Sequence, residues 1–182
     1  LWADVVALDI NVGTLRALDR RYHGRVQTAV ANRYEIENAV LEADLVIGAV
    51  LIPGTRAPAL VDNELVARMK PGSVLVDIAI DQGGCFADSR PTTHDDPTFA
   101  VHDSIFYCVA NMPGAVPNTS TRALTNVTLP YAVRLAERGV RPALREDPAL
   151  RAGLNTLGGE LTYAPVAQAH GMASVDADAL LG

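Results

Sequence analysis

The chain has 182 residues, of which 49% are hydrophobic and 20% are charged, so it can bury a core and is unlike an intrinsically disordered sequence. Its formal net charge is -6 and it has no basic run, which removes the electrostatic basis for binding nucleic acid or an anionic membrane. No apolar stretch is long enough to span a bilayer. Cys85 and Cys108 form no metal-ligand spacing and predict a reduced, cytoplasmic protein without a disulfide.

Short apolar runs alternate with helical patterns from residue 5 to residue 80. We expect strands at 5–9, 26–30, 44–50 and 73–80, and helices around Leu15 to Tyr22, at 34–40 and at 63–69. A further strand-like stretch covers 99–109. This alternation, with short connections, predicts a doubly wound α/β fold with a parallel sheet and right-handed crossovers. In such sheets, ligands bind beyond the carboxyl ends of the strands.

The residues after Pro117 lack this rhythm and predict helices. A long helix is expected at 119–138, with Asn118 or Thr119 as its cap, Gly139 as its end, and a kink or split near Thr128 because of Pro130. We further expect a helix at 142–154, a short strand or turn at 158–162, and terminal helices at 166–170 and 176–181. The composition therefore predicts two domains, 1–117 and 118–182.

The beginning of the chain differs from that of a typical complete protein. There is no initiator methionine or basic leader, and the first expected strand follows Leu1 almost at once. We therefore expect the chain to be part of a longer protein.

Polar side chains follow two of the expected strands. Asp9 ends the first, where an acid can accept hydrogen bonds from adenosine ribose hydroxyls and disfavour a 2′-phosphate; alternatively, it only caps the next helix. Asp81 and Gln82 follow the fourth, before Gly83 and Gly84. Asp81 could hold an ammonium group or act as a base, or the stretch could be an ordinary Gly-Gly turn.

Two other segments are candidates for ligand contact. Small residues at 48–53 could let the backbone approach a flat ligand, but on the sequence alone a tight strand end with a turn at Pro53 and Gly54 is the better explanation. Asn111 could bind a carboxamide and Met112 could pack on a planar ring, or the two could form a polar turn. No histidine lies in a metal-binding motif, so we expect no metal site.

Several long segments, in register along the chain, resemble bacterial alanine dehydrogenase of the alanine dehydrogenase/transhydrogenase family. They are 6–11 (VALDIN), 43–54 (ADLVIGAVLIPG), 69–84 (MKPGSVLVDIAIDQGG) and 108–117 (CVANMPGAVP). The NAD-binding subunit of proton-translocating transhydrogenase is the nearest other family, and saccharopine dehydrogenase is more distant. The segments at 89–93 and 111–113 resemble alanine dehydrogenase instead.

The resemblance implies a partial Rossmann-type domain followed by part of a substrate domain, in a cytoplasmic homo-hexamer. The implied reaction is reversible oxidative deamination of L-alanine to pyruvate and ammonium, with NAD as cofactor. Asp81 is the implied catalytic residue. The implied cofactor-binding residues are Asp9, Val50, Leu51, Ile78, Asp81, Gln82, Val109, Asn111 and Met112.

The resemblance also places essential groups before Leu1. These are the first strand with its glycine-rich phosphate loop, a catalytic histidine and the basic residues that hold the substrate carboxylate. We therefore expect this chain alone to be inactive and, with open strand edges, to aggregate. The alternative functions are a catalytically silent NAD-binding or oligomerisation module and a transhydrogenase-like NAD-binding subunit.

Overall fold

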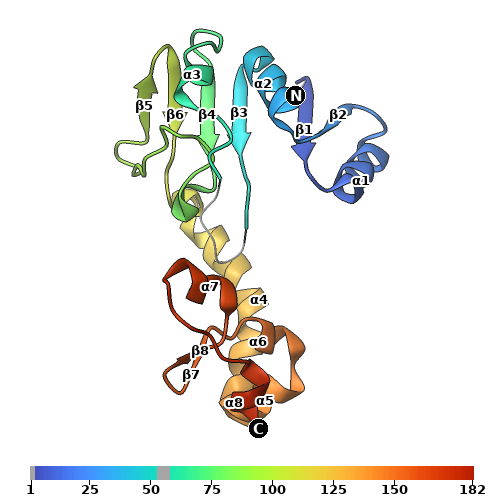
Figure 1. Ribbon diagram of the computed structural model, residues 1–182, viewed down its shortest axis with the longest axis vertical. Helices are drawn as coiled ribbons and strands as arrows, with labels where there is room; N and C mark the ends of the chain where they lie inside the picture. Colours follow the sequence, from blue (N-terminus) through green and yellow to red (C-terminus); the bar gives the residue numbers. More distant parts are fainter. Residues whose placement is uncertain (1–2, 53–57) are drawn as a thin grey trace. The chain divides into compact units, whose positions relative to one another are not determined.

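The computed structural model describes residues 3–52 and 58–182, which form two compact units. The first unit holds residues 3–51 and 58–110, and the second holds Ile52 and residues 111–182. Figure 1 labels the helices and strands of both units. The predicted turn at Pro53 and Gly54 lies outside the described residues.

The first unit alternates strands with helices, as the apolar runs predict. Its elements are β1 (Val5–Asp9), α1 (Val12–Tyr22), β2 (Val26–Val30), α2 (Arg33–Glu42), β3 (Leu45–Gly48), α3 (Asn63–Val66), β4 (Val74–Asp77), the 3₁₀ turn η1 (Ile80–Gln82), β5 (Thr98–Val101) and β6 (Ser104–Tyr107). The side chains of Asn11, Asn32 and Asp62 accept backbone hydrogen bonds at the starts of α1, α2 and α3. Because such caps satisfy N–H groups of the first turn, the local sequence determines where each helix begins.

The strands of the first unit form two sheets within the described residues (Figure 1). β1 pairs in parallel with β2, with Val5 opposite Val26. β3, β4 and β6 are parallel neighbours, and β5 is the antiparallel partner of β6. The α/β class is therefore confirmed, whereas the single strand-like stretch predicted at 99–109 is a hairpin. β1 and β3 each have one side without a strand partner among the described residues.

The core of the first unit lies where the four-stranded sheet packs against α2, α3 and the segment after β4. Phe106 of β6 is fully buried; its ring is edge-on to Phe86, with centroids 5.9 Å apart, and 5.3 Å from Phe99. The other members of this core are Val40, Val61, Leu65, Val66, Met69, Leu75, Ala79, Ile80, Cys85 and Cys108. Burial of this apolar surface is the main force that stabilises the unit.

Three elements of the first unit are shorter than predicted. β3 and α3 end at Gly48 and Val66, and β4 ends at Asp77 instead of residue 80. The carboxylate of Asp77 accepts a hydrogen bond from the N–H of Ala79 at 3.1 Å. This local bond turns the chain out of the strand and into η1.

The second unit is mostly helical, as predicted for the residues after Pro117. Its elements are η2 (Met112–Ala115), α4 (Pro117–Arg138), α5 (Val140–Glu146), α6 (Pro148–Ala152), β7 (Thr156–Leu157), β8 (Glu160–Leu161), α7 (Ala164–Ala169) and α8 (Ala177–Leu181). The hydroxyl of Ser120 donates to the carbonyl of Pro113 at 2.9 Å and ties η2 to α4. The compact unit therefore includes residues before Pro117, where the composition changes.

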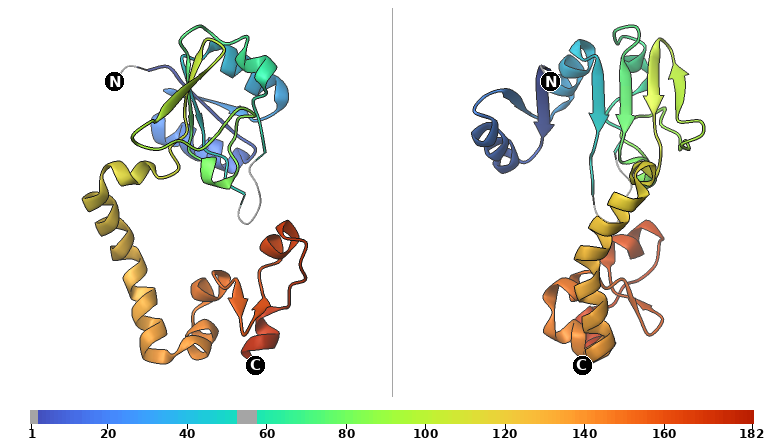
Figure 2. Two further views of the ribbon diagram at one scale, coloured as in Figure 1. Left: turned by 90° about the vertical axis from the view of Figure 1, so that its left-hand side faces the viewer. Right: turned by 180° about the vertical axis from the view of Figure 1, so that it is seen from behind.

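Helix α4 departs from its predicted form in two respects. It begins at Pro117 with Val116 at the N-cap, so the predicted cap at Asn118 or Thr119 was wrong. Proline suits the first helical position because it has no N–H group to satisfy. The helix then runs past Pro130 to its predicted end at Gly139, so of the kink or split predicted near Thr128 the split does not occur (Figure 2).

The single helix predicted at 142–154 is two helices, α5 and α6, which meet at Asp147. The carboxylate of Asp147 accepts from the N–H groups of Ala149 at 2.8 Å and Leu150 at 3.3 Å, and forms an ion pair with Arg134 of α4. Asp147 is only 8% exposed. Its buried charge therefore has both a helix start and a cation as partners.

Candidate functional site

The carboxyl ends of β1, β3 and β4 face the same edge of the first unit (Figure 1). The pairing of β3 with β4 continues one residue past the end of β4, because the N–H of Ile78 donates to the carbonyl of Gly48 at 2.8 Å. After this bond the two chains diverge, and the side chains of Leu51 and Ile78 are 62% and 52% exposed. Val50, just before Leu51, is half-buried. Exposed apolar side chains at this edge suit a flat, largely apolar ligand.

The small residue at the end of β3 has a packing role. A Cβ on Gly48 would lie 2.8 Å from the Cβ of Cys85 and 2.9 Å from Cζ of Phe86. Ordinary contacts between carbon atoms are nearer 4 Å. The close approach that requires this glycine is therefore that of the segment after β4, which lies directly against β3.

A buried carboxylate holds the loop that follows β4. Asp77 has no exposed surface, and it accepts hydrogen bonds from the N–H of Ala79 at 3.1 Å, the N–H of Cys85 at 2.8 Å and the hydroxyl of Ser89 at 2.5 Å. A carboxylate this deep needs several donors to offset the loss of water. The turn η1 lies between the first two donors along the chain.

Two of the predicted polar residues lie on η1. Asp81 is exposed and Gln82 is half-buried. Gly83 and Gly84 follow with φ angles of 101° and 81°, which side chains rarely adopt. The glycine pair is therefore a requirement of the turn, and the turn presents the carboxylate of Asp81 to solvent at the carboxyl edge of β4.

Asp9 lies at the carboxyl end of β1, and its carboxylate is oriented by the chain just after it. The N–H of Asn11 donates to Oδ1 of Asp9 at 2.7 Å. The cap of α1 is the side chain of Asn11, which accepts from Gly13 at 2.8 Å and Thr14 at 3.4 Å. The alternative interpretation of Asp9, as the cap of this helix, was therefore wrong.

The remaining predicted contacts fall into two groups. Val109 follows β6, is only 3% exposed, and lies in a bridge with Thr92. Its side chain is therefore part of the protein interior. Asn111 and Met112 belong to the second unit, where Asn111 precedes η2 and Met112 is half-buried.

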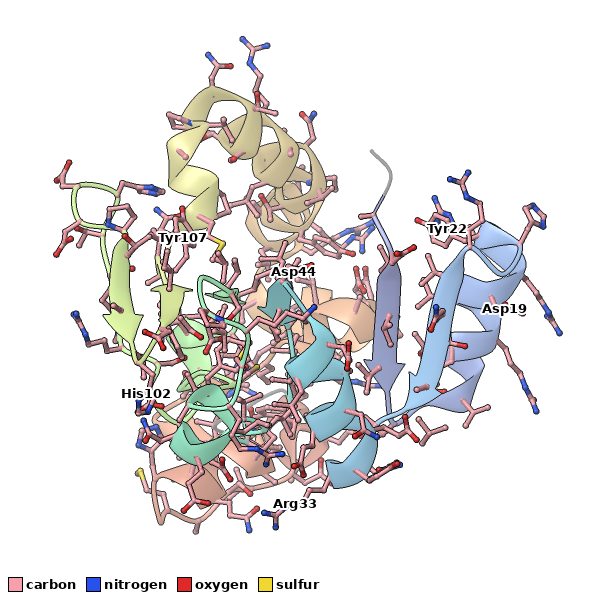
Figure 3. All side chains as sticks on the ribbon, turned by 90° about the horizontal axis from the view of Figure 1, so that it is seen from above. Asp19, Tyr22, Arg33, Asp44, His102 and Tyr107 are labelled. Atoms are coloured by element: carbon pink, nitrogen blue, oxygen red, sulfur yellow. The ribbon has the colours of Figure 1, made fainter. Side chains whose placement is uncertain are left out.

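The two cysteines and His102 have structural surroundings. Burial raises the pKa of the Cys85 and Cys108 thiols, which disfavours the reactive thiolate. His102, at the turn between β5 and β6, shares a 3.1 Å hydrogen bond with Asn63 of α3 (Figure 3). Within residues 3–52 and 58–182, no group of three acidic, histidine or cysteine side chains could hold a metal ion. No helix in this described part has the length and hydropathy needed to cross a bilayer.

The sequence interpretation missed Asp77 and Ser89. Asp77 lies inside the strand expected at 73–80, and Ser89 lies in a polar stretch typical of a surface loop. One available signal was Asp77 itself. The strand that contains it was expected to be buried on both faces, and a buried acid needs hydrogen-bond partners.

Known proteins are similar to this chain over most of its length. The family described as "Alanine dehydrogenase/PNT, C-terminal domain" matches residues 1–164. The chain is 62% identical over 165 residues to an alanine dehydrogenase of Mycobacterium tuberculosis and 61% identical over 166 residues to that of Mycolicibacterium smegmatis. It is 53% identical over 182 residues to that of Bacillus subtilis. These matches cover 91%, 91% and 100% of the chain but 44%, 45% and 48% of the relatives.

The chain therefore spans just under half the length of the curated relatives it matches. A solved structure described as L-alanine dehydrogenase is 50% identical and superimposes with a TM-score of 0.80, over 93% of this chain and 46% of that chain. This likeness confirms the Rossmann-like α/β fold that the strand and helix pattern predicts. From the match over residues 1–164 and the shared fold, the chain belongs to the alanine dehydrogenase/PNT C-terminal domain family.

Proposed function

We propose that the complete gene product containing this chain is an NAD-dependent alanine dehydrogenase. It would convert L-alanine, water and NAD to pyruvate, ammonium, NADH and a proton, and catalyse the reverse reaction. The observation that carries this proposal is the 53–62% identity to proteins named alanine dehydrogenase over at least 91% of the chain. The polar turn η1 and the exposed apolar side chains at the same sheet edge support it.

The residues at this edge fit a nicotinamide cofactor. A ribose diol needs a carboxylate acceptor, and Asp9 lies where β1 ends with its Oδ1 already held by Asn11. A planar ring needs apolar contacts, and Leu51 and Ile78 are exposed after β3 and β4. When bound, NAD would accept the hydride that leaves the α-carbon of L-alanine.

We assign Asp9 to the choice of cofactor. Its negative charge would accept ribose hydroxyls and repel a 2′-phosphate, so NAD would be favoured over NADP. An Asp9→Ala variant should therefore lower the ratio of kcat/KM for NAD to that for NADP by on the order of tenfold or more. An unchanged ratio would remove Asp9 from this role.

We assign Asp81 to the substrate. Oxidation of the α-carbon turns the amine into an imine, water adds to the imine carbon, and the nitrogen leaves as ammonium. These steps move protons on and off nitrogen and oxygen. An exposed carboxylate on a rigid turn can hold the ammonium group and exchange such protons. Gln82 would border the nicotinamide, as would the backbone near Val109.

The decisive experiment is to express the complete gene product and follow NADH formation from L-alanine. Asp81→Asn should lower kcat by on the order of 10²–10⁴-fold while nucleotide affinity stays nearly unchanged. Asp103→Asn is a matched control, because Asp103 is an exposed acid at the β5–β6 turn. NAD binding without turnover in the wild type would instead support the silent nucleotide-binding module.

The family resemblance also supports proposals on organisation. We propose that residues 1–117 form the NAD-binding domain, that residues 118–182 belong to the substrate domain, and that the complete protein is a cytoplasmic homo-hexamer. Sedimentation of the complete gene product at several concentrations would test the hexamer. A monomer at every concentration would contradict it.

A further inference from the structure

The buried carboxylate of Asp77 connects the sheet to the turn that carries Asp81. We propose that Asp77 is a positioning residue. It fixes the loop at 79–85 so that the side chain of Asp81 can reach the substrate and that of Gln82 can reach the nicotinamide. This inference rests on the proposed function, because it takes Asp81 to act on the substrate. Asp77 itself has no exposed surface and cannot touch a ligand.

The two oxygens of Asp77 hold opposite ends of this loop. Oδ1 accepts from the N–H of Ala79 at 3.1 Å, and Oδ2 accepts from the N–H of Cys85 at 2.8 Å. The hydroxyl of Ser89 also donates to Oδ2, at 2.5 Å. One rigid group at the end of β4 therefore determines where the loop leaves the strand and where it returns.

The loop has little freedom to shift around this anchor. A Cβ on Gly84 would lie 2.8 Å from Oδ2 of Asp77 and 2.8 Å from the Cβ of Ser89. At the end of the loop, the carbonyl of Cys85 also accepts a hydrogen bond from the N–H of Leu60 at 2.7 Å. Loop, carboxylate and neighbouring backbone are in close contact, so a change at Asp77 should move η1.

Asp77→Asn is the sharpest perturbation, because it preserves size and removes one acceptor. An amide has one oxygen and one NH₂ group. In either orientation the NH₂ would face a backbone N–H, that of Ala79 or that of Cys85. One end of the loop would therefore lose its partner while the core packing is unchanged.

A matched control separates positioning from simple stabilisation. Ser73 immediately precedes the same strand, and its hydroxyl shares a buried 2.8 Å hydrogen bond with that of Ser104. Ser73→Ala therefore removes a buried hydrogen bond at the opposite end of β4, away from the loop. It should lower stability without changing the kinetics.

The experiment uses the complete gene product and three measurements: hydrogen exchange of the 79–85 amides, kcat/KM for L-alanine, and the affinity for ADP-ribose, which lacks nicotinamide. For Asp77→Asn we expect lost protection at 79–85 with β6 still protected. We expect kcat/KM to fall on the order of 10²-fold, since small misplacements of a reacting group have effects of this size. The Kd for ADP-ribose should stay within about twofold, because its contacts lie at Asp9 instead.

Unchanged kcat/KM in Asp77→Asn, together with a stability loss like that of Ser73→Ala, would overturn the proposal. Unchanged exchange at 79–85 would overturn it as well. If Asp77→Asn does not fold, Ser89→Ala is the second variant, because it removes only one donor to Oδ2 of Asp77. We expect kcat/KM of Ser89→Ala to be lower than that of Ser73→Ala. Equal values would refute the positioning role. If the wild type does not oxidise L-alanine, the proposed function fails, and the exchange data alone decide whether Asp77 holds the loop.

Discussion

Replacing Gly48 by alanine tests how tightly the segment after β4 packs on β3. The added methyl group would lie 2.8 Å from the Cβ of Cys85 and 2.9 Å from Cζ of Phe86. Ordinary contact begins at 3.4 Å, so the neighbours would have to move by about 0.6 Å (3.4 minus 2.8). The first neighbour is a Cβ fixed to the backbone, and it cannot rotate away.

The expected cost follows from two opposing terms. Overpacking a well-packed interior costs about 1–3 kcal/mol. Alanine also restricts the unfolded chain more than glycine does, which returns about 0.4–1 kcal/mol. The midpoints of these two ranges differ by about 1.3 kcal/mol, and we expect Gly48→Ala to lower the free energy of unfolding of the first unit by about this amount.

Hydrogen exchange of the β4 amides at increasing urea reports the free energy of unfolding of this unit alone. Gly153→Ala in the second unit is the control for the substitution itself and is followed by exchange of the α6 amides; its Cβ would meet only ordinary contacts of 3.5 Å and 3.8 Å, so it should cost little. Phe86→Leu removes the Cζ contact. The double variant with Gly48→Ala should therefore lose about 0.5–1 kcal/mol less free energy of unfolding than the two single losses added together. A Gly48→Ala protein as stable as the wild type would refute this reasoning.

Phe106→Ala should cost the first unit about 3–5 kcal/mol, measured by the same exchange method, since it empties the centre of the core. Arg134→Met should cost the second unit about 1–2 kcal/mol in urea unfolding, a discounted value because Arg134 is half-exposed while its partner Asp147 is buried. Burial raises the pKa of Cys85 and Cys108, so the stability that these neutral thiols contribute should be full below about pH 8.5 and should be lost as the pH rises further. In the variant with both cysteines replaced by alanine, the free energy of unfolding should fall less over the same pH range. The chain alone, with its open strand edges, should aggregate in sedimentation experiments; a stable monomer would contradict this.

The order of helices and strands could be predicted because the apolar runs and capping residues are local signals. The runs predicted at 5–9 and 26–30 are β1 and β2 as the structure has them. Interruptions that depend on tertiary partners could not be predicted. Asp147 divides a helix because its carboxylate meets both the next helix start and Arg134 of α4. Nothing in the neighbouring sequence identifies that cation.

The sequence predicted at which edge of the sheet the candidate residues lie, but not which buried groups hold them there. Topology alone placed Asp9 and Asp81 after strands whose carboxyl ends share an edge. The sequence indicated only that a buried Asp77 needs partners; it could not identify Cys85 and Ser89, because they are 8 and 12 residues away and approach only when the loop folds back. The burial of Val109 likewise depends on its bridge with Thr92.

The two-stranded β1–β2 sheet has a consequence for how this chain resists proteolysis. A sheet of two strands has little stability of its own in water, and β1 has an open side here. Asp9, the proposed ribose acceptor, lies at the end of this weak element. A nucleotide bound there at 100 times its Kd would stabilise the bound form by about 2.7 kcal/mol. Resistance of this chain to proteolysis at β1 and β2 would then rise with the nucleotide concentration, so limited proteolysis would report nucleotide binding at Asp9.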